Sequence, residues 1–403
     1  MTTPTYLTDS LLSQAHTDLR RHTELYGARP PGDGSLVDAV VRSGLRGHGG
    51  AAFPTGAKMR AISGRASVLI ANGAEGEPLS SKDRVLLERS VHLILDGIAA
   101  TASALRCRDC YLYVPQDAVA GVRAAIDERR RRGWDTTHVQ VVASASGFVS
   151  GEKSAVISAI EGGPPLPRDK KNSAAVSGVR GRPTLVLNVE TFAHIALIER
   201  WGPRWFRSRG TSSEPGTMLV TYSGDVRRAG VVEVPFGSSV EEMLARDAGI
   251  DLRSVRAVLL GGFHGTWAGR DALVGRAMSR ESLADIGVRP GAGIVHVLGV
   301  GSCGLAATAE FVRYLAEESA GQCGPCLNGL PRLADAFSRL STGQNVEVAI
   351  GEIERYTRLV DGRGACHHPD GTARLIRSAM SVFADDVHLH RLGSCEIHRG
   401  GRR

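Results

Sequence analysis

The stretch that decides the fold, residues 43–59, reads SGLRGHGGAAFPTGAKM. Four of its glycines, Gly44, Gly47, Gly49 and Gly50, leave the backbone free to approach a ligand closely. Unpaired amides in such a loop can hold a phosphate, and Lys58 follows near enough to add a positive charge. Because glycine-rich loops also form ordinary turns, composition alone leaves a turn and a phosphate site equally open.

Three more polar loops adjoin apolar stretches of the chain. They read IANGAEGEPLSSKDR from residue 70, SGFVSGEKSAVISAIEG from residue 146 and GRPTLVLNVETFAHI from residue 181. Together they contribute Asn72, Glu75, Glu77, Gly151, Glu152, Asn188 and Thr191. In an open parallel sheet, ligands bind beyond the carboxyl ends of the strands, so loops of this kind can direct polar groups at a ring system. Each loop alone is equally consistent with a solvated surface turn.

The spacing of apolar residues divides the chain into parts. Between about 43 and 200, apolar strands such as ASVLIAN alternate with helical patterns, which is typical of an α/β fold with a mainly parallel sheet covered by helices. The next stretch reads as strands and turns with one helix, and amphipathic helices follow it. The predicted units are an N-terminal helical extension at 1–40, an α/β domain at 41–212, a β-rich domain at 213–300 and a helical bundle at 301–403.

Composition argues against several classes of protein. Of the 403 residues, 42% are hydrophobic and 23% charged, and no apolar run approaches the roughly 18 residues that a membrane helix needs. The N-terminus lacks the basic start and apolar stretch of a signal peptide, so we expect a cytoplasmic protein without direct membrane insertion. The net charge of +7 comes from scattered basic residues, and four arginines at 129–132 fit a solvated helix end. We therefore expect no nucleic-acid partner.

The seven cysteines are unlike a disulfide framework, and most of them lie late in the chain. The segment AEESAGQCGPCLNGLP, residues 316–331, places Cys323 and Cys326 three apart beside glycine and proline, a spacing that suits a metal cluster. Cys366 follows in GRGACHHPDGTARL. Ala320 stands where one more thiolate would complete the series.

The order of these motifs resembles the flavoprotein (F) subunit of respiratory complex I, which carries flavin and oxidises NADH, and its relatives in NAD-linked hydrogenases and formate dehydrogenases. That family carries S-G-L-R-G-R-G-G-A-G-F-P-T-G-x-K-W, then N-A-D-E-G-E-P-G-x-x-K-D-R, a G-E-E-T-A loop and P-T-x-x-N-N-V-E-T. At corresponding places this chain reads SGLRGHGGAAFPTGAKM, NGAEGEPLSSKDR, GEKSA and PTLVLNVET. The likeness covers roughly residues 40–390, so the chain is identified as a divergent member of this family.

The resemblance implies an FMN-binding domain, a ubiquitin-like (β-grasp, SLBB-type) domain at 213–300 and a helical bundle with a [4Fe-4S] cluster. It also implies an NADH dehydrogenase or diaphorase activity. Electrons would pass from NADH or NADPH through FMN to the cluster and on to a [2Fe-2S] subunit or a ferredoxin-like protein, in an assembly that can be peripheral to a membrane complex. The cofactor-binding residues implied are Gly47, Gly49, Gly50, Phe53, Lys58, Asn72, Glu75, Glu77, Gly151, Glu152, Asn188 and Thr191, and the implied cluster ligands are Cys323, Cys326 and Cys366.

Several residues depart from the family pattern near the expected nucleotide. Ala74 replaces an acidic residue, Lys153 replaces the second glutamate of G-E-E, and Leu187 replaces the first asparagine of N-N-V-E-T. Aromatic residues expected in two loops are missing, and Lys170 and Lys171 stand in one of these loops. Added lysines favour an extra phosphate, as in NADPH, or an acidic protein donor, and a decayed nucleotide site remains a third interpretation.

Ala320 cannot ligate iron, and three interpretations of the cluster follow. A [4Fe-4S] cluster can be held by three cysteines, with a small exogenous ligand or Cys395, His367 or His368 on the fourth iron. A [3Fe-4S] cluster needs three ligands only. In the third interpretation no cluster forms, and the cysteines are ordinary buried residues. Cys303 is a poor ligand candidate, because the predicted helix after it would separate it from the motif by roughly 20 Å.

Two smaller features stay open. His48 stands where the family has arginine, so it is expected either to contact the flavin phosphate or to face solvent. Cys107 and Cys110 have zinc-like spacing but no second pair nearby in the sequence, so core packing is the favoured interpretation. For the whole protein, the alternatives are a non-respiratory reductase or cluster enzyme with another donor, and a redox-inactive scaffold that kept the fold.

Overall fold

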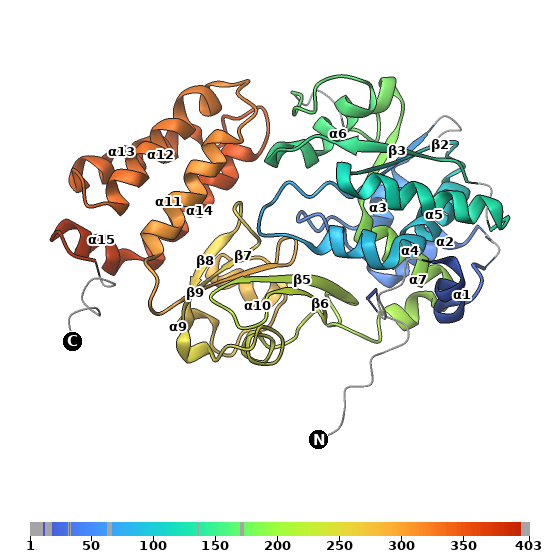
Figure 1. The fold of residues 1–403 in the computed structure, drawn as a ribbon, viewed down its shortest axis with the longest axis horizontal. Helices are drawn as coiled ribbons and strands as arrows, with labels where there is room; N and C mark the ends of the chain where they lie inside the picture. Colours follow the sequence, from blue (N-terminus) through green and yellow to red (C-terminus); the bar gives the residue numbers. More distant parts are fainter. Residues whose placement is uncertain are drawn as a thin grey trace.

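The computed structural model describes residues 11–12, 18–30, 32, 34–62, 67–134, 137–169 and 173–395. Two sheets and a helical bundle make up the molecule (Figure 1). None of the described helices is both long and apolar enough to cross a membrane. The first two helices are α1 (Leu19–Tyr26) and α2 (Leu36–Ser43), and α2 continues past residue 40, the predicted end of the N-terminal extension.

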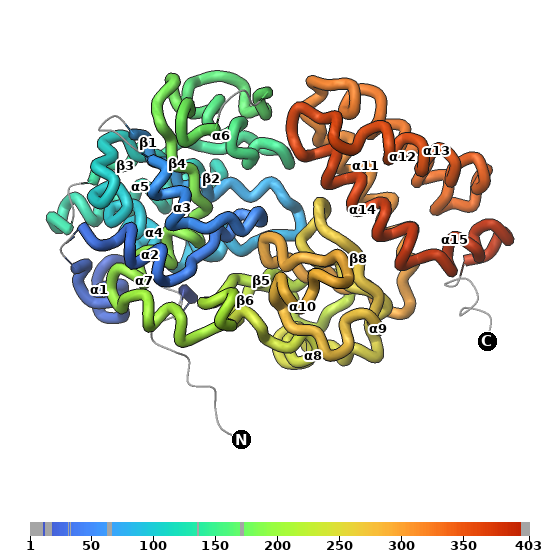
Figure 2. The backbone as a smooth tube through the Cα atoms, turned by 180° about the vertical axis from the view of Figure 1, so that it is seen from behind, coloured from blue at the N-terminus to red at the C-terminus, as the bar shows by residue number. Residues whose placement is uncertain are grey.

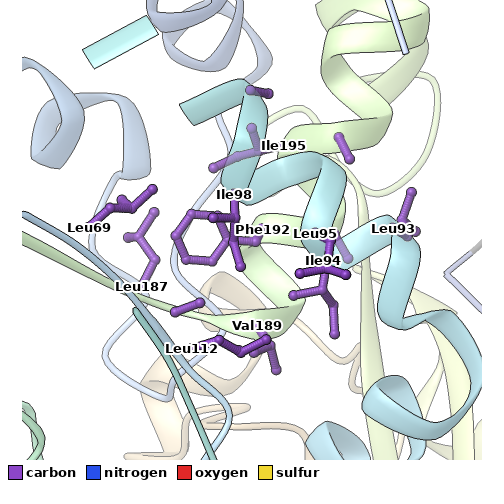
Figure 3. Packing of buried hydrophobic residues seen from close by; sticks show 14 of the residues in the cluster. Leu69, Leu93, Ile94, Leu95, Ile98, Leu112, Leu187, Val189, Phe192 and Ile195 are labelled. Carbon is purple, nitrogen blue, oxygen red and sulfur yellow. The ribbon is translucent and has the colours of Figure 1, made fainter. Parts of the chain in front are cut away.

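Four parallel strands form the first sheet, in the order β3-β2-β1-β4. They are β1 (Val68–Asn72), β2 (Asp109–Pro115), β3 (Val139–Ser144) and β4 (Thr184–Asn188). Because side chains alternate along a strand, Leu69 and Leu112 face the helices α4 (Lys82–Leu105) and α7 (Val189–Phe206), whereas Val68 faces α6 (Lys153–Ile160). Figure 3 shows Leu69, Leu112 and Leu187 gathered around Phe192 of α7. The predicted parallel sheet with helices on both faces is confirmed, and α3 (Thr55–Arg60) and α5 (Val119–Arg131) complete this unit.

The close crossing of α4 and α7 depends on Gly97. A Cβ atom built on Gly97 would lie 1.9 Å from the carbonyl oxygen of Phe192, so a larger residue must push the two helices apart. We predict that Gly97→Ala lowers the free energy of unfolding by about 1–3 kcal/mol, as measured by denaturant titration with circular dichroism. Gly121 in α5 is the matched control, since a Cβ atom there meets nothing within 4 Å. Gly121→Ala should leave stability unchanged or raise it by up to about 1 kcal/mol, and equal losses in both variants would contradict the packing argument.

Five strands form the second sheet, in the order β6-β5-β9-β7-β8. They are β5 (Thr217–Gly224), β6 (Gly230–Pro235), β7 (Val255–Leu260), β8 (Thr266–Gly269) and β9 (Ile294–Gly299), and the short helices α8 (Val240–Met243), α9 (Arg270–Leu273) and α10 (Arg280–Leu283) lie between them. The first and last strands run parallel in the centre, and every other neighbouring pair is antiparallel. This is the strand arrangement of a β-grasp fold, so the ubiquitin-like expectation is confirmed.

The C-terminal bundle contains α11 (Gly304–Glu317), α12 (Leu330–Ser341), α13 (Val346–Val360), α14 (His368–Val382) and α15 (Ala384–Arg391). Their apolar faces bury Leu305, Phe337, Ile353 and Ile376 in one core. The predicted helical bundle is confirmed. Its last two helices, α14 and α15, are separate because the backbone leaves helical geometry at Phe383 (φ −107°, ψ 32°).

The second sheet packs directly on the bundle. Alternate residues of β7 divide between two cores, with Leu259 facing the bundle and Val258 facing the other side of the sheet. Trp267 of β8 joins Leu259 in the bundle core, and Figure 2 shows β8 beside α14. We propose residues 41–212, 213–300 and 301–403 as the three domains, with the second joined to the third by this shared apolar layer.

Candidate functional site

All four loops singled out in the sequence meet beyond the carboxyl ends of β1 and β4. The side-chain amide of Asn72 donates to the Gly151 carbonyl oxygen at 3.0 Å, and the Asn188 amide donates to the Asn72 carbonyl oxygen at 3.2 Å. The backbone amide of His48 donates to the hydroxyl of Thr191 at 3.0 Å. Since β2 and β4 flank β1 on opposite sides, this edge is the topological switch point of the sheet, where ligands of open α/β folds bind.

The glycine loop presents free backbone donors at this edge. Within the part of the chain that the structure describes, the four amides of residues 49–52 donate no hydrogen bond of ordinary geometry. Gly50 (φ +94°) and Ala52 (φ +49°) adopt positive φ, which turns successive amides toward one side and suits an anion. The turn itself is closed by the Gly47 amide, which donates to the Phe53 carbonyl oxygen at 3.0 Å. The phosphate-site interpretation of this loop is therefore the one that its geometry favours.

Two lysines add positive charge beside these amides. A Cβ atom on Gly47 would lie 3.9 Å from Lys58 Nζ, so the ammonium group is next to the loop. Burial lowers the pKa of Lys58, and the charge of Lys153 lowers it further. Neither lysine pairs with a carboxylate among the described residues, and an anion would relieve their mutual repulsion. Free amides and unpaired ammonium groups fit the phosphate of FMN. The Phe53 side chain is 51% exposed, and its ring centroid lies 5.9 Å from Lys58 Nζ. The ring therefore leaves a face open beside the loop.

Three of the side chains expected at the flavin also cap helices. Glu75 accepts the backbone amides of Asp83 and Arg84, both at 3.1 Å, at the start of α4. Glu152 accepts the amides of Ser154 and Ala155 at the start of α6. Asn188 caps α7 and accepts the Glu190 amide at 3.0 Å. These hydrogen bonds fix the loops on their helices.

A buried charge network lies beneath the glycine loop. Lys82 contacts Asp83 at 2.7 Å and Glu190 at 2.9 Å, and its own burial would lower its pKa, but the two carboxylates raise the pKa overall. His48 Nδ1 lies 3.0 Å from Glu190, and its side chain is buried. The solvent-facing alternative for His48 is therefore wrong, because a carboxylate inside the fold holds its ring. Leu219 of β5 donates its amide to Glu190 at 2.8 Å, so the same carboxylate joins the first two units.

Glu77 joins the second loop to the β-grasp unit and carries a pH-dependent contact. Its carboxylate accepts the Phe263 amide at 2.8 Å, and burial raises its pKa to about 7. At pH values between the usual pKa near 4.5 and the raised pKa of about 7, Glu77 therefore keeps its proton in the folded chain and releases it in the unfolded chain. We predict that the free energy of unfolding of the unaltered chain falls relative to that of Glu77→Gln as the pH rises across this window, by at most about 1.4 kcal/mol per pH unit. Thermal unfolding of both proteins from pH 4.5 to 8 checks it, with the exposed Glu88→Gln as the variant that should keep the slope.

Phe148 connects the flavin-side loops with the bundle. Its amide donates to Glu318 at the end of α11 at 3.1 Å, and its ring lies 6.2 Å from that of Tyr314 and 5.4 Å from that of His368. Glu318 stands two residues before Ala320, and His368 stands two residues after Cys366. Both flanks of the cysteine motif therefore contact one aromatic residue of the third loop.

The three cysteine thiols of the motif lie beyond the end of α11, just before α12 and α14. The sulfur atoms of Cys323 and Cys326 are 3.8 Å apart, and Cys366 is near enough that its charge raises the pKa of Cys326. Burial would raise the pKa of Cys323, but hydrogen bonds from the backbone amides of Ala365 and Cys326 lower it overall and favour the thiolate. The donor set fits an iron–sulfur cluster, because thiols from two segments lie near one another and backbone amides favour the thiolate of Cys323.

None of the side chains considered as a substitute for the missing thiol is placed to act as one. His368 has both ring nitrogens engaged, with the Leu315 carbonyl oxygen at 2.7 Å and with His264 at 3.1 Å. His367 is exposed and pairs with Asp370. Cys395 lies instead with Cys303, at the far end of α11. Lys170 and Lys171, expected near the nucleotide, lie outside the described residues.

Sequence reasoning missed several residues that build the site. Lys82 and Glu190 lie within the quoted loops and carry charge, but only their burial reveals that they form a network. Phe148 and Glu318 are 170 residues apart, and no spacing rule joins them. Cys107 and Cys110 lie in the core of the first unit, where burial raises the pKa of their thiols to about 11 and about 12, as expected for packing residues.

Comparisons with known proteins agree with this layout. Residues 40–197 match the Nuo51 FMN-binding domain, and residues 306–390 match the NADH-ubiquinone oxidoreductase-F iron-sulfur binding region. The chain is 32% identical to the F 2 subunit of NADH-quinone oxidoreductase from Rhizobium meliloti (strain 1021), with 88% of each chain covered. It is 30% identical to the NADP-reducing hydrogenase subunit HndC of Solidesulfovibrio fructosivorans, with 88% of this chain and 76% of that protein covered.

Solved structures of an NAD+-reducing [NiFe]-hydrogenase share the fold. In the air-oxidized state the TM-score is 0.84 at 28% identity over 94% of this chain, and in the H2-reduced state it is 0.82 at 29% identity over 88%. The chain spans 66% and 62% of those hydrogenase chains, which is less than two thirds of their length. The two matched regions and the 32% identity to an F subunit over 88% of this chain show the family. The chain belongs to the family of NADH-quinone oxidoreductase flavoprotein (F) subunits.

Proposed function

We propose that this chain oxidises NADH or NADPH through FMN and passes the electrons to an iron–sulfur cluster in its bundle. The observation that carries this function is the set of free amides at residues 49–52 beside two unpaired lysines, at the switch point of a parallel sheet. FMN, when bound, supplies the chemistry that accepts a hydride and releases electrons singly. The matched FMN-binding and iron-sulfur binding regions support the same assignment.

The chain's own residues bind and orient the reactants. The amides of residues 49–52 and the ammonium group of Lys58 hold the flavin phosphate, and Asn72 and Asn188 keep the surrounding loops in register. The exposed ring of Phe53 offers a stacking surface for the nicotinamide or adenine. Gly151 and Thr191 contribute through the loop–loop hydrogen bonds that close this edge.

The contact made by Phe148 would bring bound FMN and the cluster close to each other. Because its amide donates to Glu318 and its ring lies beside that of His368, both segments that carry Cys323, Cys326 and Cys366, the thiols that would hold the cluster, are kept against the third loop. The aromatic rings of Phe263 and Tyr314 pack there at 5.4 Å. A packed contact of this kind would keep donor and acceptor at one distance.

The next acceptor is a [2Fe-2S] subunit or a ferredoxin-like protein. The net charge of +7 favours an acidic partner, because opposite charge accelerates encounter. An assembly peripheral to a membrane complex and a free hydrogenase-type complex both accommodate such a subunit, as the two kinds of relative indicate. The exposed Lys153 at the start of α6 is placed to favour the extra phosphate of NADPH.

Anaerobic titration of the purified full chain tests this function. We expect flavin absorption and a broad iron–sulfur shoulder, flavin bleaching on addition of NADH or NADPH, and bleaching of the shoulder afterwards. The Cys323→Ser/Cys326→Ser variant is the matched control, in which flavin should bleach without a shoulder. A colourless protein that does not take up added FMN would support the scaffold alternative, and bound flavin that neither nucleotide bleaches would support another donor.

A further inference from the structure

Cys303, His390 and Cys395 form a second ligand group, separate from the cysteine motif. Their sulfur and nitrogen ligand atoms all lie within 4.8 Å of one another. Cys303 is the N-cap residue of α11, and His390 lies in the last turn of α15. Both are buried, whereas Cys395 is half-buried. The group lies at the opposite end of α11 from Ala320, and fourteen helical residues correspond to about 21 Å.

The imidazole of His390 is oriented as a metal ligand. Its Nδ1 lies 3.0 Å from the carbonyl oxygen of Leu340, which accepts the Nδ1 proton. The proton on Nδ1 leaves a lone pair on Nε2, and this atom faces the sulfur of Cys303 at 3.7 Å. Metal-binding histidines commonly donate their second ring nitrogen to a backbone carbonyl in this manner, because the hydrogen bond fixes the tautomer.

The position of Cys303 favours a bound thiolate. As the N-cap residue, Cys303 directly precedes the backbone amides of the first turn of α11, and a helix N-terminus favours negative charge.

We propose that Cys303, His390 and Cys395 bind one zinc ion. Tetrahedral zinc with Zn–S of about 2.3 Å and Zn–N of about 2.0–2.1 Å separates sulfur and nitrogen by about 3.6 Å. The observed separation of 3.7 Å between Cys303 and His390 matches that edge. Binding releases the two thiol protons to solvent and changes no oxidation state. The fourth position is left to water.

A single ion fits this group better than a second cubane. Zinc takes mixed cysteine and histidine ligands, whereas [4Fe-4S] clusters are held by cysteine thiolates, and this group includes a histidine. Here three donors converge on one point. The zinc ion would tie α15 and the segment after it to the start of α11 and, through the Leu340 hydrogen bond, to α12. The site is thus structural, and it leaves electron transfer to the cysteine motif.

Metal analysis of the full-length protein, purified anaerobically, tests this site. We expect one zinc ion per chain in the unaltered protein and in the Cys323→Ser/Cys326→Ser variant, and loss of zinc with retained iron in Cys303→Ser and Cys395→Ser. Cys110→Ser is the matched control, because this buried cysteine lies in β2, and it should keep both metals. Since Cys395 is half-buried, its variant is expected to fold even where Cys303→Ser does not.

Three outcomes would overturn the zinc site. One is unchanged zinc in Cys395→Ser, and another is loss of iron rather than zinc in the same variant, which would place a cluster here. The third is an intact-protein mass that shows a Cys303–Cys395 disulfide in place of zinc. As a further readout, cobalt added to the metal-depleted chain should give the ligand-field bands of tetrahedral thiolate coordination, and Cys395→Ser should abolish them.

Discussion

Replacing Lys58 by methionine is expected to weaken the binding of FMN by about 10- to 100-fold. The ammonium group lies beside the free amides of the glycine loop, and a hydrogen bond to a charged group contributes about 1.5–3 kcal/mol. Methionine keeps the length of the side chain but removes its charge, so the loop should keep its shape. Fluorescence titration of the flavin-depleted protein measures the dissociation constant directly.

Riboflavin, which lacks the phosphate, shows what Lys58 contacts. If Lys58 binds the phosphate, Lys58→Met should weaken FMN but leave riboflavin binding unchanged. Lys153→Met is the matched variant, and because Lys153 is exposed its effect on FMN should be smaller. Equal weakening of FMN and riboflavin would place Lys58 at the ring instead, and unchanged FMN binding would remove it from the site.

The meeting of the polar loops could be predicted from the sequence, because the carboxyl ends of parallel strands lie at one edge of the sheet. Asn72 and Asn188 directly follow apolar runs, so their meeting depends only on β1 and β4 being neighbours. The paired register of these two residues confirms that inference. The glycine spacing of the first loop likewise predicted open amides, because few other residues adopt the φ of Gly50.

Other parts of the site depend on distances that the sequence does not carry. Glu75 matches a family motif at the flavin, yet it caps α4 from seven residues upstream of that helix, an approach that only the folded loop creates. His48 was ambiguous because its partner, Glu190, is far away in the chain. Cys303 was set aside correctly as a ligand of the cysteine motif, but its contact with His390 joins residues 87 apart without any spacing signal.

Double substitution of Cys323 and Cys326 by serine is expected to remove the cluster iron completely while flavin stays bound. These sulfurs lie 3.8 Å apart, and a cluster deprived of both keeps at most Cys366 as a thiolate ligand. The flavin loops lie across the Phe148 contact and share no ligand with the motif. Iron and flavin per chain, measured on anaerobically purified protein, check both parts. Persistent iron in this variant, with iron lost in Cys303→Ser, would move the cluster to the other end of α11.

Adding the missing thiol then distinguishes a three-iron from a four-iron cluster. Ala320 follows the end of α11 closely and leads into the loop that carries Cys323, so Ala320→Cys restores the family's ligand set. If the chain holds [3Fe-4S], iron per chain should rise by one. If it holds [4Fe-4S] with a small exogenous ligand, iron should stay constant while that site becomes closed to added ligands. Iron that is absent before and after the substitution would mean that these thiols are packing residues, and electron transfer would then end at the flavin.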